Sequence, residues 1–137
     1  DRMTTGLLLL TNDGELSNKL LHPKFHIPRI YEAKIDKVLD FKTIHNIAKG
    51  IFIGKGEFGR AEVLKQRKVK KRVTVHLKLF TGKKREIRRI FSFLSIQIFS
   101  LKRIKYGPIL LGDLPCGEWR TLNDTEVNQL KTFSRSK

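Results

Sequence analysis

Cysteine, acidic side chains and long apolar runs are scarce in this sequence. The single cysteine, Cys116, excludes an internal disulfide and is compatible with a reducing cytosol. No stretch approaches the roughly 20 consecutive apolar residues that a membrane-spanning helix needs. The apolar run over 6–10 is also too short for the core of a signal peptide. We therefore expect a cytoplasmic protein without a membrane partner.

The shortage of acidic residues leaves a large positive charge. The chain has 29 Lys and Arg against 13 Asp and Glu, a formal net charge of +16. The excess is concentrated in residues 55–105, which carry seventeen basic and three acidic side chains, whereas 1–54 carry eight and six and 106–137 carry four of each. Self-repulsion of this size is unfavourable without a compensating anion, and a nucleic-acid backbone is the commonest one. The alternative is a solvated basic face.

Repeats, linkers and low-complexity tracts are also absent, and 137 residues suit one domain. Apolar periodicity of two predicts strands, and a period near 3.6 predicts helices. We expect strands over 5–11, 30–38, 61–66, 72–80 and 96–104, and helices over 15–22, 40–49, 83–94 and from 124 onward, with a frayed tail over 134–137. Because strands and helices are intermingled without a regular βαβ rhythm, the predicted fold class is α+β with a mixed, mainly antiparallel sheet.

Capping and helix-terminating residues support the predicted helices. Asp13 and Asp40 are placed to cap helices, Pro23 ends the first of them, and Gly50 ends the second. The residues Asn123–Glu126 have the spacing of a capping box, in which side chain and backbone satisfy each other reciprocally. These signals set the expected ends of three helices.

The segment 83–89 (KKREIRR) crowds five cations into the start of a predicted helix. The helix macrodipole favours negative charge at that end, so the arrangement makes sense if the helix start receives phosphates or a buried carboxylate. A solvated face, partly neutralised by Glu86, is the alternative. Anion binding is the interpretation that we favour.

Two sequence patterns resemble ligand-binding motifs, but the secondary structure expected around them excludes both as binding sites. Residues 54–59 (GKGEFG) match the dinucleotide-binding pattern G-x-G-x-x-G, but a strand and not a helix follows them, so a glycine-rich turn is expected. His22 and His26 have a spacing that can place two metal ligands on one helix face, but Pro23 breaks that helix. We expect no metal and no cofactor.

Four segments of the chain resemble the RsuA-type family of bacterial ribosomal RNA pseudouridine synthases. Residues 1–14 (DRMTTGLLLLTNDG), continued by 15–23, are similar to the family's catalytic motif. Its tyrosine motif corresponds to 29–31 (RIY), its basic motif to 82–91 (GKKREIRRIF), and a further segment to 101–108 (LKRIKYGP), followed by 112–115 and 117–119. The matches occur in the family's order and spacing over nearly the whole chain.

The resemblance implies an activity and a set of site residues. The family isomerises a specific uridine in ribosomal RNA to pseudouridine, with one indispensable aspartate and without cofactor or metal. Asp1 would be that catalytic residue, either as a nucleophile or as a general base. Because the base must leave the helical stack to be reached, a flipped nucleotide is expected.

Three more residues match the family's substrate-binding positions. Tyr31 would stack on the uracil, although a core tyrosine on a strand is the simpler interpretation without the resemblance. Arg88 would pair with the aspartate and orient it, and Leu101 would line the uridine pocket. The remaining cations are candidates for contacts with RNA phosphates: Arg2, Lys83, Lys84, Arg85, Arg89 and Arg103.

The chain begins at the aspartate, without the Gly-Arg-Leu that usually precedes it in the family. We therefore expect residues 1–137 to be a catalytic domain that lacks its early strands and an S4-like RNA-binding domain. The function would belong to the intact parent protein, which we expect to be a monomer. The rival hypothesis is a non-catalytic RNA-binding or ribosome-associated module with the same fold.

Overall fold

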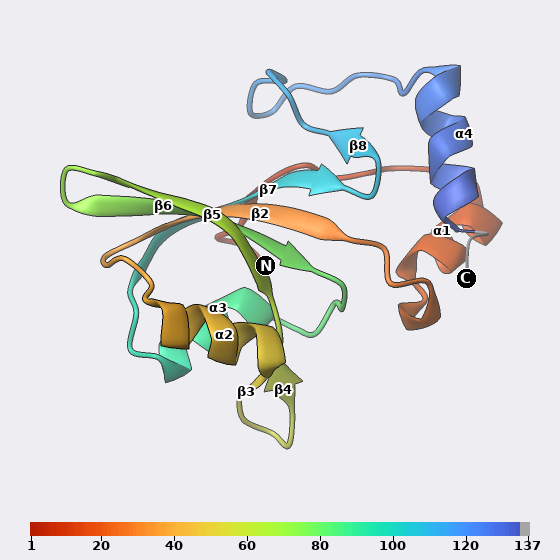
Figure 1. The fold of residues 1–137 in the computed structure, drawn as a ribbon. Helices are drawn as coiled ribbons and strands as arrows, with labels where there is room; N and C mark the ends of the chain where they lie inside the picture. The colour runs from red at the N-terminus through yellow and green to blue at the C-terminus, as the bar shows by residue number, and fades with distance from the viewer. Residues whose placement is uncertain (135–137) are drawn as a thin grey trace.

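A curved sheet is the framework of the protein, and the computed structural model describes residues 1–134 (Figure 1). The strand order is β1 (Thr5–Gly6), β7 (Ile98–Tyr106), β2 (Arg29–Ile35), β6 (Arg72–Leu79) and β5 (Glu62–Val69), with β8 (Ile109–Leu110) paired to β7. In this described part of the chain, only the β1–β7 pair is parallel. The predicted α+β class with a mixed, mainly antiparallel sheet is confirmed.

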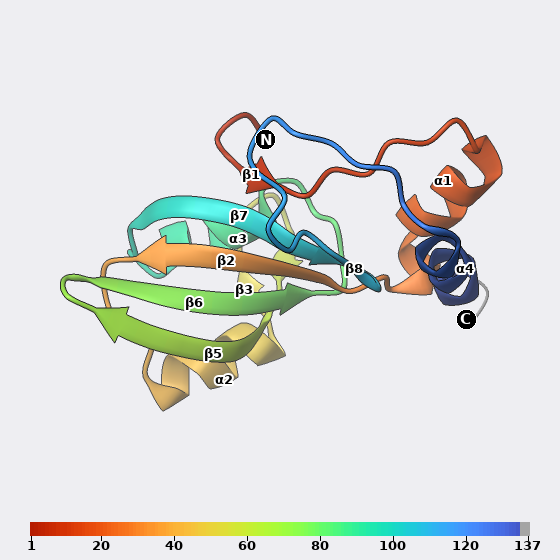
Figure 2. The ribbon, with the colours of Figure 1, turned by 90° about the horizontal axis from the view of Figure 1, so that it is seen from above.

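The helices divide into two groups (Figures 1 and 2). The helices α2 (Phe41–Lys49) and α3 (Glu86–Phe93) lie against one face of the sheet, which we call the inner face. The helices α1 (Gly14–Leu21) and α4 (Asp124–Phe133) lie together beyond one end of the sheet, and a short 3-10 turn, Pro23–Phe25, follows α1. A small hairpin of β3 (Ile51–Phe52) and β4 (Phe58–Gly59) projects beside α2, so residues 54–57 form the predicted glycine-rich turn.

The predicted caps are present. Asp13 accepts a hydrogen bond from the Leu16 N–H at 3.0 Å, and Asp40 accepts one from the Thr43 N–H at 2.8 Å. In α4 the capping box is complete, and Arg120 also donates two hydrogen bonds of 2.8 Å to Glu126. Those bonds lower the pKa of Glu126 to about 2. Local sequence therefore determines where these three helices begin.

Two apolar clusters stabilise the arrangement. The main core lies between the inner face and the helices α2 and α3, and its buried members include Val73, Val75, Leu77 and Leu79, which follow the predicted alternation. The second cluster joins α1 and α4 through Leu20 and Leu130, together with Ile27, Tyr106 and Ile109. The β7 strand contributes to both, so it connects the two parts of the fold.

The strand predicted over residues 5–11 is largely wrong. Only Thr5 and Gly6 pair with β7, and one further bond joins the Leu7 N–H to the Arg103 carbonyl at 2.8 Å. Beyond this point the chain leaves the sheet, and Leu8 and Leu10 are 70% and 87% exposed. Their side chains border a wide apolar groove of about 900 Å³ between this segment, the loop over 111–122 and α4.

Within the described part of the chain, every helix is too short or too polar to cross a membrane. The start of the predicted frayed tail is ordered, because Ser134 is buried and its hydroxyl donates to the Lys131 carbonyl at 2.8 Å. The rest of that predicted tail, 135–137, lies outside the described residues.

Candidate active site

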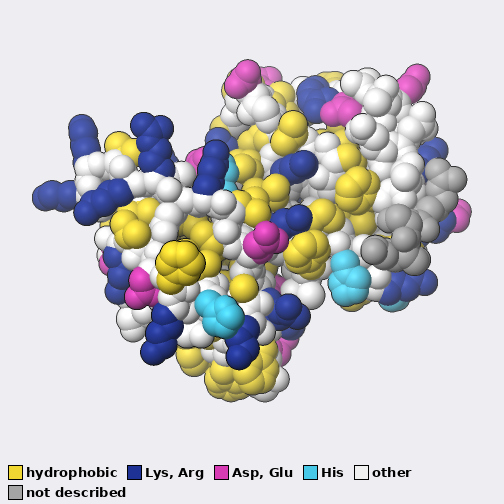
Figure 3. All heavy atoms as spheres, in the orientation of Figure 1, with side chains coloured by type: hydrophobic (Ala, Val, Ile, Leu, Met, Phe, Trp, Pro, Cys, Tyr) yellow, Lys and Arg dark blue, Asp and Glu magenta, His cyan; other side chains and the backbone are white. Residues whose placement is uncertain are grey.

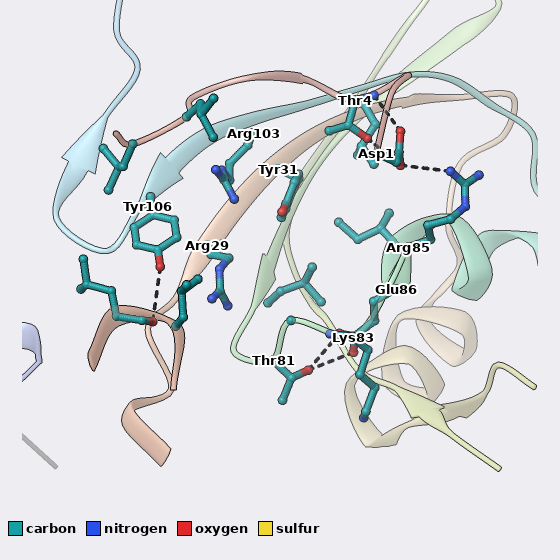
Figure 4. A pocket seen from close by; sticks show the side chains of 18 of the residues that line it. Asp1, Thr4, Arg29, Tyr31, Thr81, Lys83, Arg85, Glu86, Arg103 and Tyr106 are labelled. Atoms are coloured by element: carbon teal, nitrogen blue, oxygen red, sulfur yellow. Dashed lines mark hydrogen bonds and ion pairs between the residues drawn. The ribbon is translucent and has the colours of Figure 1, made fainter. Parts of the chain in front are cut away.

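A cavity of about 390 Å³ opens on the inner face, between the first residues of the chain, the loop before α3 and the end of α1 (Figure 4). Strands, helix and loop each contribute to its wall. The sheet provides Tyr31 from β2 and Leu101 and Arg103 from β7, and α3 provides Arg88. Residues that are far apart in the sequence thus surround the carboxylate of Asp1.

The Asp1 carboxylate is held from two sides. Its Oδ1 accepts hydrogen bonds from the backbone N–H groups of Met3 at 2.8 Å and Thr4 at 2.9 Å. Its Oδ2 accepts one from the Thr4 hydroxyl at 2.9 Å and pairs with Arg88 Nε at 2.9 Å and Arg85 at 3.3 Å. The side chain is only 14% exposed. The carboxylate is therefore fixed in position at the edge of the cavity.

Arg88 and Arg85 make unequal contributions to this arrangement. Arg88 is 17% exposed and also donates from Nη2 to the Thr4 hydroxyl at 3.3 Å. It therefore contacts both the Asp1 carboxylate and the hydroxyl that is bonded to this carboxylate. Arg85 is 46% exposed, and among residues 1–134 its side chain has only the longer contact with Asp1. Arg88 fits an orienting role, and Arg85 keeps donors free at the cavity rim.

The prediction that five cations occupy the first turns of a helix is wrong in its boundary. The helix α3 begins at Glu86, and Arg85 before it adopts a left-handed conformation with φ 53°. Lys83 and Lys84 therefore lie in the preceding turn, because the chain reverses at Arg85 before the helical hydrogen bonds start. Of the five cations in the segment 83–89, Arg88 and Arg89 are the two that lie within the helix.

The helix start does receive a buried carboxylate, and it belongs to Glu86. Its side chain is 3% exposed and accepts hydrogen bonds from the Thr81 hydroxyl at 2.9 Å, the Lys83 N–H at 3.3 Å and the Arg60 N–H at 3.0 Å. Buried carboxylates are stable only when they are hydrogen-bonded in this way. Glu86 thereby shapes the loop that carries Lys83 and Arg85 to the cavity.

Arg89 does not reach the cavity. Its guanidinium donates to the carbonyls of Ile53 at 3.1 Å, Lys84 at 3.0 Å and Gly54 at 3.1 Å, and it pairs with Glu57 at 3.0 Å. These contacts tie the β3–β4 turn to α3 and occupy most of its donors. The expected phosphate contact of Arg89 is therefore not supported by the structure, because the side chain is already committed to the fold.

The remaining predicted site residues divide according to position. Tyr31 is half-buried against the main core and lies between Asp1 and Arg29 in the view of Figure 4. Leu101 is buried and also lines the cavity. Lys83 and Arg103 also line the cavity, and the Lys83 ammonium donates to the Phe58 carbonyl. The other two predicted cations, Arg2 and Lys84, are exposed outside the cavity wall.

Sequence reasoning missed three residues of the site: Thr4, Arg29 and Tyr106. Thr4 bridges Asp1 and Arg88, and only its place beside the aspartate signals this. The guanidinium groups of Arg29 and Arg103 lie 5.2 and 5.1 Å from the ring centre of Tyr106, which is a cation–π arrangement. The position of Arg29 two residues before Tyr31 on the same strand was the available signal.

The geometry combines a fixed carboxylate, an aromatic wall and a cationic rim. A carboxylate in this setting can act as a nucleophile or as a general base. The ring of Tyr31 offers a plane on which a flat base can stack, and the cations of the rim can bind phosphates. The cavity volume falls within the usual range for small-molecule sites, about 300–1,000 Å³.

Comparison with known proteins gives consistent matches. Residues 1–93 match the family described as RNA pseudouridylate synthase. An uncharacterised RNA pseudouridine synthase of Aquifex aeolicus is 37% identical over 95% of this chain and 52% of the relative, and the ribosomal large subunit pseudouridine synthase B of Bacillus subtilis is 35% identical over 98% and 56%.

A solved structure described as a pseudouridylate synthase is also similar, with a TM-score of 0.82 and 28% identity over 93% of this chain and 55% of that one. The chain spans about half the length of these relatives.

Proposed function

The chain belongs to the RNA pseudouridylate synthase family, and we propose that it isomerises a uridine of ribosomal RNA to pseudouridine, with Asp1 as the catalytic residue and without a cofactor. The observation that carries the proposal is the Asp1 carboxylate, fixed by Arg88 and Thr4 at the edge of a cavity walled by Tyr31. The name of the Bacillus subtilis relative makes large-subunit RNA the first substrate to test.

The proposed reaction breaks the bond between N1 of uracil and C1′ of ribose and forms a bond between C5 and C1′. Asp1 begins it either by attacking the nucleotide or by removing a proton from the sugar. The freed uracil turns within the cavity and rejoins through C5, and this step releases Asp1 or returns the proton to the sugar. The hydrogen of C5 leaves as a proton, and N1 takes up a proton, so the product has the composition of the substrate. Substrate and product are isomers with no net change of oxidation state, so the proposed reaction needs no redox cofactor, group donor or energy source.

The protein must hold the nucleotide in place while the base is detached. The target uridine enters the cavity flipped out of the stack, and the ring of Tyr31 supports its base. Buried Leu101 forms the apolar wall behind it. The low exposure of Asp1 and Arg88 limits the access of water, which would otherwise compete for the open sugar.

The cations at the rim bind the RNA backbone around the flipped nucleotide. Arg85, Lys83 and Arg103 line the cavity, and Arg2 and Lys84 lie beyond its wall. We leave Arg89 out of this group, because its contacts with the β3–β4 turn occupy it. The backbone contacts orient the substrate, and the cavity selects the base.

The test is release of tritium from ribosomal RNA labelled at C5 of uridine, with the full-length protein. Asp1→Asn should abolish release, because the amide is neither a nucleophile nor a base at neutral pH. It keeps an acceptor oxygen for the N–H groups of Met3 and Thr4, so folding should be retained. The matched control is Asp113→Asn, at an exposed position outside the cavity, which should leave the rate unchanged.

Tritium release by the Asp1→Asn protein would refute the catalytic assignment. If the unmodified protein binds RNA but releases no tritium from any ribosomal RNA, the result would favour the rival hypothesis of a non-catalytic RNA-binding module. Mapping of pseudouridine in the ribosomal RNA after the reaction then identifies the target uridine.

A further inference from the structure

The face of the sheet opposite α2 and α3, here called the outer face, carries a regular array of cations. Side chains alternate between the two faces of a strand, so the neighbours of the buried residues Ala33, Val75 and Leu101 point outward. Seven of the outward residues of β5, β6, β2 and β7 are basic: Lys65, Arg67, Arg72, Lys78, Lys34, Lys102 and Lys105.

The strand register places these cations in adjacent rows. Across β7, β2, β6 and β5, one row is Lys102, Glu32, His76 and Lys65, and the next is Ser100, Lys34, Thr74 and Arg67. A third row is Lys105, Ile30, Lys78 and Glu62. Rows follow one another at about 7 Å along the strands, and neighbouring strands are about 4.8 Å apart. Every row therefore presents two cations on a surface only a few strands wide.

Acidic residues do not neutralise this surface. Glu32 is hydrogen-bonded to His76 at 3.0 Å, and Glu62 is the other carboxylate in the three rows. Among the described residues, the seven cations make no ion pair with a carboxylate. The array continues into the β5–β6 turn, where Lys70 and Lys71 are exposed, and Figure 3 shows Lys and Arg gathered at that end of the molecule.

The outer face is separate from the candidate active site. Tyr31 and Leu101 line the cavity from the inner face, whereas their strand neighbours Glu32 and Lys102 point to the other side. None of the seven outer cations lines the cavity. The function proposed above therefore leaves this charge unexplained.

We propose that the outer face binds the phosphate backbone of a double-stranded RNA segment. This is a second contact with the RNA, in addition to the contact with the nucleotide that enters the cavity. The identity of the polyanion rests on the proposed function, since an enzyme of ribosomal RNA meets duplex RNA on its substrate. A-form duplexes are recognised mainly through their shape and their phosphate and 2′-hydroxyl groups, which suits a broad array of cations.

The aromatic residues of the outer face favour a duplex over a single strand. Binding of single strands depends on exposed rings on which bases stack. Here the Arg72 guanidinium lies 4.2 Å from the ring centre of Phe99, and the Lys78 ammonium lies 5.0 Å from that of Phe80, although the two residues are 39% and 42% exposed. A stacking base would have to displace the cation that lies over each ring, whereas the phosphates of a duplex can contact these cations where they are.

The experiment measures binding of the full-length protein to a 20-base-pair RNA duplex made only of G·C pairs, over a range of salt concentrations. Such a duplex offers no uridine, so recognition of a flipped uridine in the cavity does not contribute, and any phosphate binding at the cavity rim is the same in all variants. The test variant carries Lys34→Gln, Lys65→Gln, Arg67→Gln and Lys102→Gln. The matched control carries Lys24→Gln, Lys42→Gln, Lys49→Gln and Lys55→Gln, four exposed cations outside the outer face that remove the same charge.

The outer-face variant should reduce the slope of log affinity against log salt by about three to four, since each phosphate contact contributes about 0.9. The control should change the slope by less than about one. A third variant, Lys34→Arg with Lys65→Arg and Lys102→Arg, keeps the charge and should bind as the unmodified protein does. Circular dichroism confirms that each variant is folded.

Equal losses in the outer-face variant and the control would overturn the proposal, because only total charge would then matter. Unchanged duplex binding in the outer-face variant would also overturn it. Binding to vesicles of anionic phospholipid is measured in parallel, and a variant that loses affinity for the vesicles but not for the duplex would overturn the proposal as well. Tritium release is a separate readout: a protein that fails to isomerise uridine but shows the predicted salt slopes would refute the proposed function and leave the outer-face site standing.

Discussion

Two arginines share the Asp1 carboxylate but differ in how firmly they are held. Arg88 contacts both Asp1 and Thr4 from within α3, whereas Arg85 is half exposed in the turn before the helix. A charge-assisted hydrogen bond in a shielded site orients its partner more effectively than a longer, solvated contact. The two residues should therefore contribute unequally to turnover.

We predict that Arg88→Ala lowers the turnover of labelled RNA at saturating concentration by about a hundredfold or more, the cost of a misplaced reacting group. Arg85→Ala should lower it by less than about tenfold and act mainly on RNA affinity. Single-turnover tritium release separates the two effects. Equal losses of turnover in both variants would contradict the division of roles.

Neighbouring residues on a helix can have unrelated roles, as Arg88 and Arg89 show. Successive residues are about 100° apart around the axis, so Arg88 faces Asp1 while Arg89 faces the β3–β4 turn. The basic motif alone put both among the site residues. Only the position of the β3–β4 turn shows that the Arg89 guanidinium is hydrogen-bonded to this turn.

At the scale of elements, the contact between β1 and β7 fixes the segment that carries Asp1. Gly6 has φ +103°, and a Cβ at this position would lie 2.2 Å from the Arg103 carbonyl oxygen. A glycine is therefore required for β1 to approach β7. Because Arg103 also donates from Nε to the Leu7 carbonyl at 2.8 Å, the same contact aligns the cavity wall.

We predict that Gly6→Ala lowers the free energy of unfolding by at least about 2 kcal/mol, from the clash and the unfavourable φ together. Turnover should fall with it, since the Asp1 segment loses its attachment. Urea unfolding with linear extrapolation measures the change. The control is Gly14→Ala at the start of α1, where the added Cβ meets no atom within 4 Å, and the change should stay within about 0.5 kcal/mol.

Most elements could be predicted from the sequence because their signals are local. The caps of α1, α2 and α4 and the alternation of β6 depend on residues a few positions apart. Three strand ends differ from the prediction by two or three residues, since β2 ends at Ile35, β5 at Val69 and β7 at Tyr106. The larger exceptions are the segment over 5–11 and the start of α3. In the first, pairing ends after Gly6 because the chain leaves β7, and in the second, Glu86 folds the preceding turn by bonding to Arg60 on another element. Neither partner is visible in the local pattern.

At the scale of the whole molecule, the net charge of +16 should affect stability as well as binding. The cations of the outer face repel one another on adjacent strands without carboxylate partners. Salt screens such repulsion, because the Debye length falls from about 30 Å at 0.01 M to about 3 Å at 1 M. Folding without RNA should therefore be favoured by salt.

We predict that the melting temperature rises by a few degrees between about 0.01 M and 1 M sodium chloride, which corresponds to roughly 1 kcal/mol in a domain of this size. The variant that lacks four outer-face cations should melt higher at low salt and rise less. Differential scanning calorimetry at matched pH checks both. A melting temperature that is independent of salt would show that the repulsion is negligible in the folded state.

The sequence by itself determined the α+β class, the helix caps, the cationic character and, through the family motifs, the residues at which to look for chemistry. These properties depend on composition and on residues close together in the chain. The tertiary structure decided which cations serve the cavity, which hold the fold and which form the outer face. That division depends on strand register and on contacts between distant segments, such as Asp1 with Arg88 and Arg60 with Glu86, which no local pattern records.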